Sequence, residues 1–283
     1  MEAVDPKGVC IDEIAANLEL GDSGIWFSKG KSEVSYPSAG NESCFEIEDH
    51  SFWFRHRNRC INTVVRGFPP AGAIFDLGGG NGFVSLALQQ DGWQNVVVEP
   101  GRAGALNARK RGLVNVICST LEDADFRSHS LPAAGLFDVL EHLADDQQFL
   151  ECLRERLAPG GRVYLSVPAY QWLWSAEDVS AGHFRRYTLS SLKSVLRLSG
   201  FQIDYASYIF SPLPPAILLK RTIPSLLGRR SVENTDDGVQ EHRSGSATLT
   251  RILDGVFEWE LRMVERKKTI PVGGSCLVVA RSR

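Results

Sequence analysis

The stretch Ile74-Phe75-Asp76-Leu77-Gly78-Gly79-Gly80-Asn81-Gly82 runs from an apolar segment directly into a glycine-rich loop. Glycines at every second position, Gly78, Gly80 and Gly82, permit a tight turn and let a ligand approach the backbone closely. A dinucleotide-binding fingerprint would need its third glycine at position 83, where Phe83 stands. The spacing, with Asp76 just before it, therefore favours a nucleoside ligand without a pyrophosphate; the alternative is a turn that binds nothing.

Around this loop, short β-branched runs alternate with helix-like stretches, as in a parallel sheet with crossover helices. We expect strands at residues 73–77, 95–98, 114–118, 136–140, 161–167, 201–208 and 275–280. We expect helices at residues 83–90, 101–111, 145–157 and 189–198, the third stopped by Pro159-Gly160-Gly161 and the fourth capped by Thr188. The predicted fold class is α/β, a Rossmann-like seven-stranded and mostly parallel sheet whose final strands add an antiparallel edge.

Two segments lie outside this alternating pattern. Residues 1–67, with two aromatic-basic clusters, indicate an N-terminal cap in front of a sheet domain at 68–283. An insertion at about 209–270 precedes the last strand. Prolines interrupt the first part of the insertion, which therefore cannot form one regular helix. The composition of residues 229–246 predicts a mobile polar loop, and the apolar spacing in residues 247–268 predicts an amphipathic helix.

Composition narrows the function classes. The chain has 283 residues, a net charge of -3 and a pI near 6.1, which argues against a nucleic-acid partner bound through a broad basic surface. Six scattered cysteines without a Cys-x-x-Cys pair favour reduced thiols in the cytoplasm. The N-terminus lacks the features of a secretory signal, and no uninterrupted apolar run is long enough to span a bilayer.

The apolar stretch 210–227 either packs on the helix at 247–268, lines an acceptor pocket or touches a membrane surface peripherally.

Acidic and apolar residues after the next two strands complete a nucleoside site. Glu99 ends the second strand, about twenty residues after the first glycine, where a carboxylate accepts ribose hydroxyls. Thr120 and Leu121 follow the third strand, and Leu121 offers an apolar face to an adenine ring. An exposed Glu after a strand is commonly only solvated, so the prediction depends on the glycine loop beside it.

With these residues, the chain resembles class I S-adenosylmethionine-dependent methyltransferases over about residues 52–210. It looks closest to the bacterial small-molecule branch, of the type 11/12 kind, near the ubiquinone-type O-methyltransferases. The departures are Ala133-Ala134-Gly135 at the start of the fourth strand, where an acidic-led run is usual, and the long insertion. The resemblance rests on the glycine loop, on Glu99 and on three further motifs: Phe137-Asp138-Val139-Leu140-Glu141-His142-Leu143, Leu157-Ala158-Pro159-Gly160-Gly161-Arg162 and Gly182-His183-Phe184-Arg185-Arg186-Tyr187.

The resemblance implies S-adenosylmethionine as cofactor, held by the glycine loop and Glu99. It also implies an Arg in the helix before the first strand that meets the cofactor carboxylate, and spacing to Ile61 makes Arg57 the best match. Phe137 in the fourth-strand motif completes the predicted cofactor-binding residues.

Catalytic candidates follow the fourth strand and the loop after the fifth. His142 is the first candidate for a general base, because an unperturbed imidazole titrates near physiological pH, and His183 is the alternative. Glu141 is the third catalytic candidate. His142 could equally cap the following helix or hold the surroundings of the cofactor. Asp138, Glu141 and His142 also offer ligands for a divalent metal such as Mg²⁺, but most class I members need none.

The predicted acceptor-binding residues are aromatic or basic: Trp53, Tyr170, Trp174, Arg186 and Tyr187. The arginines would favour an anionic or polar group on the acceptor, unless they only form salt bridges to Glu177 or Asp178. We therefore expect an enzyme that methylates a small molecule, at an oxygen nucleophile. The alternatives are a non-catalytic binding module on the same fold and a Rossmann-type nucleotide-dependent oxidoreductase. Oligomeric state is not predicted.

Overall fold

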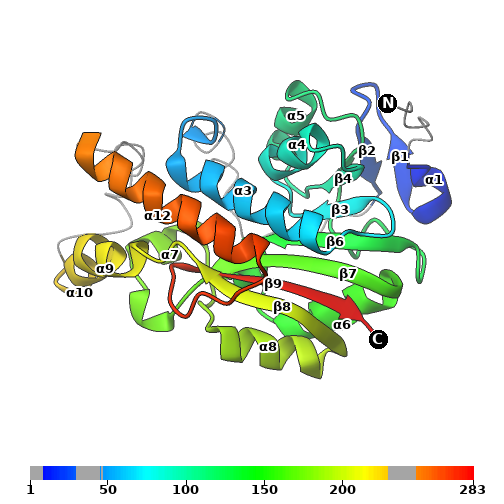
Figure 1. The fold of residues 1–283 in the computed structure, drawn as a ribbon. Coiled ribbons are helices and arrows are strands. Elements are labelled where there is room, and N and C mark those ends of the chain that lie inside the picture. Colours follow the sequence, from blue (N-terminus) through cyan, green and yellow to red (C-terminus); the bar gives the residue numbers. More distant parts are fainter. Residues whose placement is uncertain (1–8, 30–44, 46, 229–246) are drawn as a thin grey trace.

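A computed structural model describes residues 9–29, 45, 47–228 and 247–283 of the chain. The predicted loop at 229–246 lies outside the described residues. Within the described part, one mixed sheet is flanked by helices on both faces (Figure 1). Its nine strands are β1 (Leu18–Leu20), β2 (Trp26–Ser28), β3 (Ile74–Leu77), β4 (Asn95–Val98), β5 (Val116–Cys118), β6 (Leu131–Phe137), β7 (Leu157–Pro168), β8 (Phe201–Ile209) and β9 (Ser275–Ser282).

The strand order is β1-β2-β5-β4-β3-β6-β7-β9-β8. Strands β5, β4, β3, β6 and β7 run parallel, so their carboxyl ends meet at one edge. Strand β9 lies between β7 and β8 and pairs antiparallel with both. The predicted α/β class, with a mostly parallel sheet and an antiparallel edge, is confirmed.

The strand count was underestimated, because the described part of the sheet has nine strands rather than seven. The two extra strands, β1 and β2, come from the segment predicted as a cap, and β2 pairs parallel with β5. Each is only three residues long, too short for an alternating pattern to be read. Ile25, just before β2, is buried against α5 (Arg102–Lys110) and anchors this hairpin to the sheet.

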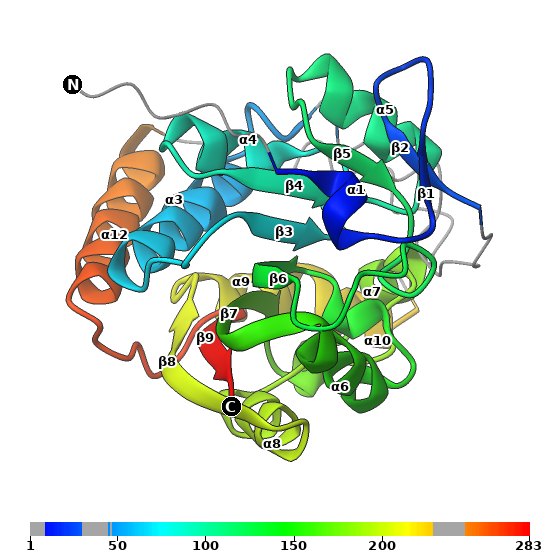
Figure 2. The same ribbon diagram turned by 90° about the vertical axis from the view of Figure 1, so that its right-hand side faces the viewer.

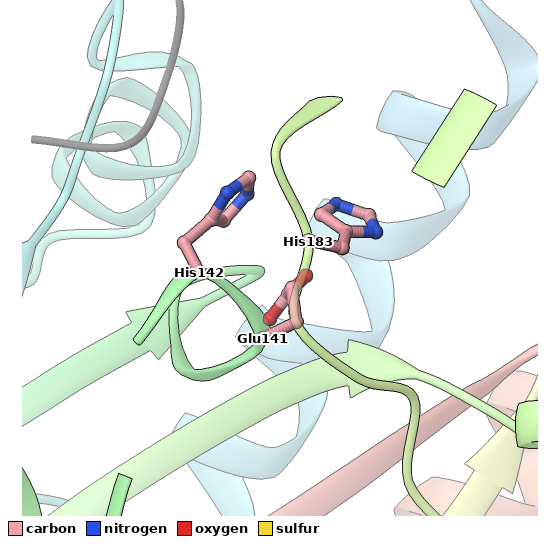
Figure 3. Close-up of side chains that lie close together, drawn as sticks. All are labelled: Glu141, His142 and His183. Atoms are coloured by element: carbon pink, nitrogen blue, oxygen red, sulfur yellow. The ribbon is translucent and has the colours of Figure 1, made fainter. Parts of the chain in front are cut away.

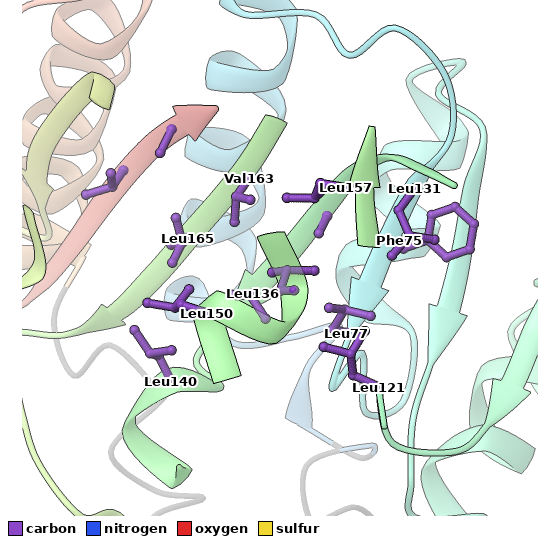
Figure 4. Packing of buried hydrophobic residues seen from close by; sticks show 14 of the residues in the cluster. Phe75, Leu77, Leu121, Leu131, Leu136, Leu140, Leu150, Leu157, Val163 and Leu165 are labelled. Carbon is purple, nitrogen blue, oxygen red and sulfur yellow. The ribbon is translucent and has the colours of Figure 1, made fainter. Parts of the chain in front are cut away.

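Helices cover the two faces of the sheet in separate groups (Figure 2). Alternate residues of β3 show the division. Ile74 belongs to the buried cluster that includes residues of α3 (Phe52–Gly67), α4 (Phe83–Gln90) and α12 (Ala247–Glu265), whereas Phe75 belongs to the cluster that includes residues of α6 (Asp146–Arg156) and α8 (Leu189–Leu198). Figure 4 shows Phe75, Leu136 and Leu165 in the second of these clusters. The helices are α1 (Ile11–Ile14), α3 (Phe52–Gly67), α4 (Phe83–Gln90), α5 (Arg102–Lys110), α6 (Asp146–Arg156), α7 (Ala176–Ala181), α8 (Leu189–Leu198), α9 (Leu213–Ile217), α10 (Ile223–Leu226) and α12 (Ala247–Glu265), with the short helical turns η1 (Leu140–His142), η2 (Gln171–Leu173) and η3 (Leu218–Thr222).

Local signals set several boundaries as predicted. Helices α4 and α8 have the expected bounds, and the Thr188 hydroxyl caps α8 by accepting the Ser191 N–H at 3.1 Å. The fourth strand was placed wrongly at 136–140. It is β6, Leu131–Phe137, because Asp138 has a φ of 59° and turns the chain out of the sheet. The fifth strand also starts earlier than predicted, since β7 begins at Leu157 and includes the Pro-Gly-Gly turn expected to precede it.

The insertion forms two helical parts. The first is α9, η3 and α10, and its hydrogen bonding changes to a π-type turn in η3, as expected of a segment that cannot be one regular helix. The second is α12, the predicted amphipathic helix, which lies beside α3 in both views (Figures 1 and 2). No helix in the described ranges is long and apolar enough to cross a membrane.

Glu260 anchors α12 to the rest of the fold. Its side chain is fully buried and accepts hydrogen bonds from His56 Nε2 at 2.8 Å and from the backbone N–H groups of Phe210 and Ser211. Burial alone would raise the pKa of Glu260, but the hydrogen bonds from His56 and Ser211 outweigh it and lower that pKa. One carboxylate thus ties α12 to α3 and to the start of the insertion.

Candidate active site

The glycine loop joins β3 to α4 at the carboxyl edge of the sheet. Gly78, Gly80 and Gly82 have positive φ angles of 69°, 53° and 75°, which residues with a side chain rarely adopt. At Gly82 space is also lacking, because an added Cβ would lie 2.4 Å from Leu113 Cδ1. The backbone itself therefore requires the alternating glycines.

Glu99 follows β4 and holds the glycine loop in place. Its Oε2 accepts a hydrogen bond from the Gly80 N–H at 2.8 Å, and its Oε1 accepts one from the Gly101 N–H at 2.7 Å. Each carboxylate oxygen has two lone pairs and can accept from a second donor such as a ribose hydroxyl. The carboxylate is buried and oriented at the loop, which fits the group that a nucleoside would need there.

Asp76 lies beneath the same loop. Its Oδ2 accepts a hydrogen bond from the Ser85 hydroxyl of α4 at 2.7 Å. Burial raises the pKa of Asp76 to about 6, although the Ser85 hydrogen bond and the Arg57 charge oppose that shift. In this structure Asp76 joins the end of β3 to the first turn of α4.

Arg57 reaches from α3 to the end of β6. Its guanidinium forms an ion pair with Asp138 and lies 4.8 Å from the centroid of the Trp53 ring and 5.2 Å from that of Phe54. The Asp138 carboxylate also accepts a hydrogen bond from the Ser166 hydroxyl at 3.2 Å. Arg57 is therefore buried between aromatic rings at the same sheet edge as the glycine loop.

Glu141, His142 and His183 come together from two segments, η1 and the loop after α7 (Figure 3). One potential ligand atom from each lies within 4.8 Å of the others, and the two imidazole rings are 4.7 Å apart in an edge-on arrangement. Burial and the neighbouring His183 lower the pKa of His142 to about 4. Burial and the Asp138 charge raise the pKa of Glu141 well above its ordinary value. The His142 imidazole is therefore uncharged at neutral pH, and the shift at Glu141 favours the protonated carboxyl.

Glu141 has one oxygen, Oε2, without a hydrogen-bond partner among the described residues, although the side chain is buried. The metal-ligand set considered from the sequence was Asp138, Glu141 and His142. The structure instead groups Glu141 and His142 with His183, while Asp138 is paired with Arg57.

Residues 47–206 match the family described as Methyltransferase domain. The match covers more than half of the 283-residue chain and includes the glycine loop, Glu99 and the Glu141-His142-His183 group. The chain belongs to this methyltransferase family. No curated protein matches it.

Solved structures resemble the methyltransferase over most of its length. A Thermotoga maritima protein described as an S-adenosylmethionine-dependent methyltransferase, possible histamine N-methyltransferase, has a TM-score of 0.54 and 16% identity over 87% of this chain and 95% of that one. The [4+2]-cyclase SpnF has a TM-score of 0.54 and 15% identity, over 89% and 99% of the two chains. Phosphoethanolamine N-methyltransferase 2 of Haemonchus contortus has a TM-score of 0.53 and 17% identity, over 91% of this chain and 61% of that one.

The family and the fold confirm the enzyme class expected from the sequence, a class I methyltransferase that uses S-adenosylmethionine. The finer placement near ubiquinone-type O-methyltransferases stays a prediction.

The loop after α7 of the methyltransferase is organised around Asp178. Arg186 donates to both carboxylate oxygens of Asp178, at 2.7 and 2.9 Å, and His183 Nδ1 lies 2.9 Å from Oδ1. Burial would raise the pKa of Asp178, but the hydrogen bonds from His183 and Arg186 dominate and lower it to about 2. Arg186 thus makes the salt bridge considered as the alternative to acceptor binding.

Other predicted acceptor-binding residues of the methyltransferase also have partners within the chain. The Tyr187 hydroxyl donates to Asp146 at 2.6 Å in a buried setting. Tyr170 has a φ of 62° and stacks between Trp172 and Tyr208, and Trp53 stacks on Phe210 at 5.5 Å. Trp174 is half-buried after η2. Direct acceptor contact by these residues stays a prediction.

Three predicted cofactor contacts lie close to the core of the methyltransferase. Leu121 is buried in the cluster that contains Phe75, and Phe137 is buried on the opposite face near α3. The Thr120 hydroxyl accepts the Asp123 N–H at 3.0 Å and shapes the turn after β5. Their contact with the cofactor is untested.

Sequence reasoning missed a polar network over the glycine loop of the methyltransferase. The Asn81 side chain donates to Glu48 at 3.3 Å and accepts from Asn107 at 3.0 Å, and Arg111 forms an ion pair with Glu48 at 2.8 Å. Burial raises the pKa of Glu48, with Arg111 acting in the opposite direction. Asn81 was part of the quoted motif, but its partners are far along the chain and no local spacing signals them.

Proposed function

We propose that this methyltransferase transfers a methyl group from S-adenosylmethionine to a hydroxyl oxygen of a small molecule. The observation that supports an oxygen acceptor is the pair of imidazoles, His142 and His183, 4.7 Å apart at the carboxyl edge of the sheet. A hydroxyl becomes a strong nucleophile only when its proton is removed, whereas a neutral amine can attack directly. A neutral imidazole at this edge can take that proton.

The cofactor would be held by the glycine loop and by the carboxylate of Glu99. Arg57 would meet the cofactor carboxylate by exchanging its ion pair with Asp138 for that anion, while Trp53 and Phe54 keep the guanidinium in place. Bound S-adenosylmethionine supplies an activated methyl group on a sulfonium. The chain then has to align the acceptor oxygen and accept its proton.

His142 and His183 are placed differently for the role of base. His142, with a pKa lowered to about 4, is neutral at physiological pH but a weak base. His183 is oriented by the ionised Asp178, which stabilises an imidazolium when the proton arrives. The raised pKa of Glu141 favours its protonated form, in which the carboxyl can donate a hydrogen bond.

A divalent metal held by Glu141, His142 and His183 is the second possibility for this site. Glu141 Oε2 lacks a partner among the described residues, and burying a cation beside it would favour the carboxylate. Two imidazoles and one carboxylate suit zinc, manganese or iron better than Mg²⁺, which prefers oxygen ligands. Excess chelator should abolish turnover if the metal is used, and full activity in chelator would remove this possibility.

The acceptor is proposed to be a small molecule rather than nucleic acid, since the net charge is -3. The protein would act in the cytoplasm. A phenol, a lipid-linked sugar or a secondary-metabolite hydroxyl would supply such an acceptor. Two similar proteins are described as a possible histamine N-methyltransferase and as a phosphoethanolamine N-methyltransferase. Because a cyclase shares the fold, the fold alone does not decide the chemistry.

Separate replacements test the proposal. His142→Ala and His183→Ala should each leave the affinity for S-adenosylhomocysteine unchanged, and the variant that lacks the base should lose about 100-fold or more in turnover of a hydroxyl acceptor. Unchanged turnover in both variants would reject the site. Tryptophan fluorescence titration with S-adenosylhomocysteine and with NAD would reject an oxidoreductase. Binding without any turnover across acceptor classes would support a binding module.

A further inference from the structure

An apolar stripe lies on the outer side of the helical segment after β8. Leu219, Leu226 and Leu227 have exposed fractions of 66%, 79% and 61%, and Ile223 is also exposed. Positions 219, 223, 226 and 227 share one face of a helix, the spacing that normally faces a core. Here that face points to solvent, so several large apolar side chains form one contiguous surface. We call these four residues the leucine stripe.

The described segment that carries the leucine stripe is basic in sequence. From residue 205 to residue 228 the sequence contains no Asp or Glu, whereas it contains Lys220 and Arg221. Lys220 is exposed next to Leu219. A helical segment with an apolar face and basic neighbours has the composition of helices that lie in the plane of an anionic bilayer surface.

The leucine stripe is close to the candidate active site. η3 packs against η2 and α7, and the buried Thr222 hydroxyl donates to the Leu173 carbonyl at 3.0 Å. Trp172 on η2 and Val179 on α7, the two elements against which η3 packs, are also exposed. Figure 1 shows α9 and α10 at one end of the molecule, beside α7.

We propose that the leucine stripe inserts into the surface of an anionic phospholipid bilayer and that the acceptor is an amphiphile drawn from that bilayer. The second half of this inference rests on the proposed function. The apolar side chains of the stripe would anchor the enzyme in the bilayer surface, and the basic residues would be attracted to anionic headgroups. Trp172 would lie at the membrane–water interface, where an amphipathic ring is favoured. An acceptor with a hydroxyl on its head and an apolar tail would then reach the Glu141-His142-His183 group from the membrane side.

Co-sedimentation of the full chain with lipid vesicles tests the surface. The probes are vesicles of phosphatidylcholine alone and of phosphatidylcholine mixed with phosphatidylglycerol. Wild type should bind the mixed vesicles more tightly, and salt should weaken that binding. The double variant Leu226→Ser, Leu227→Ser should bind about tenfold more weakly or worse, and Lys220→Gln should lose about threefold to fivefold. Leu198→Ser is the matched control, since Leu198 is 68% exposed but lies on α8, away from the stripe.

Three outcomes would overturn the proposal. The first is that wild type does not bind vesicles at low salt, and the second is that the double variant binds them as well as wild type does. The third is that wild type is a dimer and the double variant a monomer, because the stripe would then bind a second copy of the chain. Titration of the same samples with S-adenosylhomocysteine, without vesicles, tests the proposed function independently of membrane binding. Absence of cofactor binding by wild type would contradict the proposed function but would not change the conclusion from vesicle binding. If vesicles bind but a hydroxyl amphiphile in them is not methylated faster than a soluble analogue, the acceptor half is overturned.

Discussion

His183 Nδ1 lies 2.9 Å from Asp178 Oδ1, and the same carboxylate accepts two hydrogen bonds from Arg186. The Asp178 carboxylate therefore fixes the His183 imidazole through Nδ1, which leaves Nε2 for other partners. Such a partner commonly sets both the tautomer and the orientation of a reactive histidine.

Replacing this carboxylate tests whether His183 needs that orientation. Asp178→Asn should lower turnover about 10- to 100-fold with little change in affinity for S-adenosylhomocysteine, because the amide cannot stabilise an imidazolium. Turnover and cofactor titration measure the two effects. Ser175→Ala is the control, since Ser175 shares the cap of α7 with Asp178 but does not contact His183. Equal losses in both variants would show that only the helix cap matters.

Glu99 is expected to control cofactor affinity. Glu99→Gln replaces one acceptor oxygen by a donor, which conflicts with the Gly80 or Gly101 N–H and with a ribose hydroxyl. The dissociation constant for S-adenosylhomocysteine should rise about tenfold or more. The control is Glu122→Gln, an exposed acidic residue after the next strand. Unchanged affinity in the Glu99 variant would contradict the predicted ribose contact.

Alanine substitutions at two glycines distinguish the cost of a positive φ angle from the cost of steric crowding. Gly92 has a φ of 88° with no atom within 4 Å of an added Cβ, so Gly92→Ala should lower the free energy of unfolding by only about 1 kcal/mol. Gly82→Ala adds a Cβ 2.4 Å from Leu113 Cδ1 and should lower it by about 3 kcal/mol and weaken cofactor binding. Urea denaturation compares them. Similar losses in the two variants would mean that the loop can shift to admit a side chain.

Asp76 predicts an unusual dependence of stability on pH. Its folded pKa, about 6, lies above the ordinary value of 3.8, so the fold favours the protonated form. Asp76 therefore supports folding below pH 4, and that support is lost as the pH rises through 6. Asp76→Asn should be more stable than wild type at pH 8 by on the order of 2 kcal/mol, with no advantage at pH 4. Thermal melts across this range measure it, with Asp12→Asn, at an exposed position, as the matched control.

Glu260 and Glu258 both link α12 to α3, in different surroundings. Glu260→Ala leaves His56 and two backbone N–H groups without their buried acceptor and should lower the free energy of unfolding by about 3 to 5 kcal/mol. Glu258→Ala removes an exposed ion pair with Arg59 and should change it by less than about 1 kcal/mol. Urea denaturation distinguishes them, and a small loss for Glu260 would show that the insertion docks by apolar contacts alone.

The fold could be predicted from sequence where the signal was local. The β3 strand followed by alternating glycines, the bounds of α4 and α8, and the Thr188 cap all follow from short-range spacing. β1 and β2 could not be predicted in this way, because three-residue strands gain their stability from pairing with β5 rather than from their own pattern.

The individual residues of the candidate site could be predicted from the sequence, but their contacts with one another could not. His142 and His183 were selected separately, yet their edge-on contact depends on the loop after α7 folding back over η1. Likewise, nothing near Arg186 or Arg57 in the sequence decides that Asp178 and Asp138 are their partners. Long-range ion pairs carry no spacing rule, so only the tertiary structure shows them.

The position of β9 has a consequence for how the chain folds. β8 pairs with β9 alone among the described strands, and β9 is separated from it by the entire insertion. While the ribosome is still making the insertion, β7 has an unpaired edge and β8 has nowhere to attach. The late arrival of β9 therefore closes the sheet and should be a slow step in folding, during which chaperones or aggregation compete for the open edge.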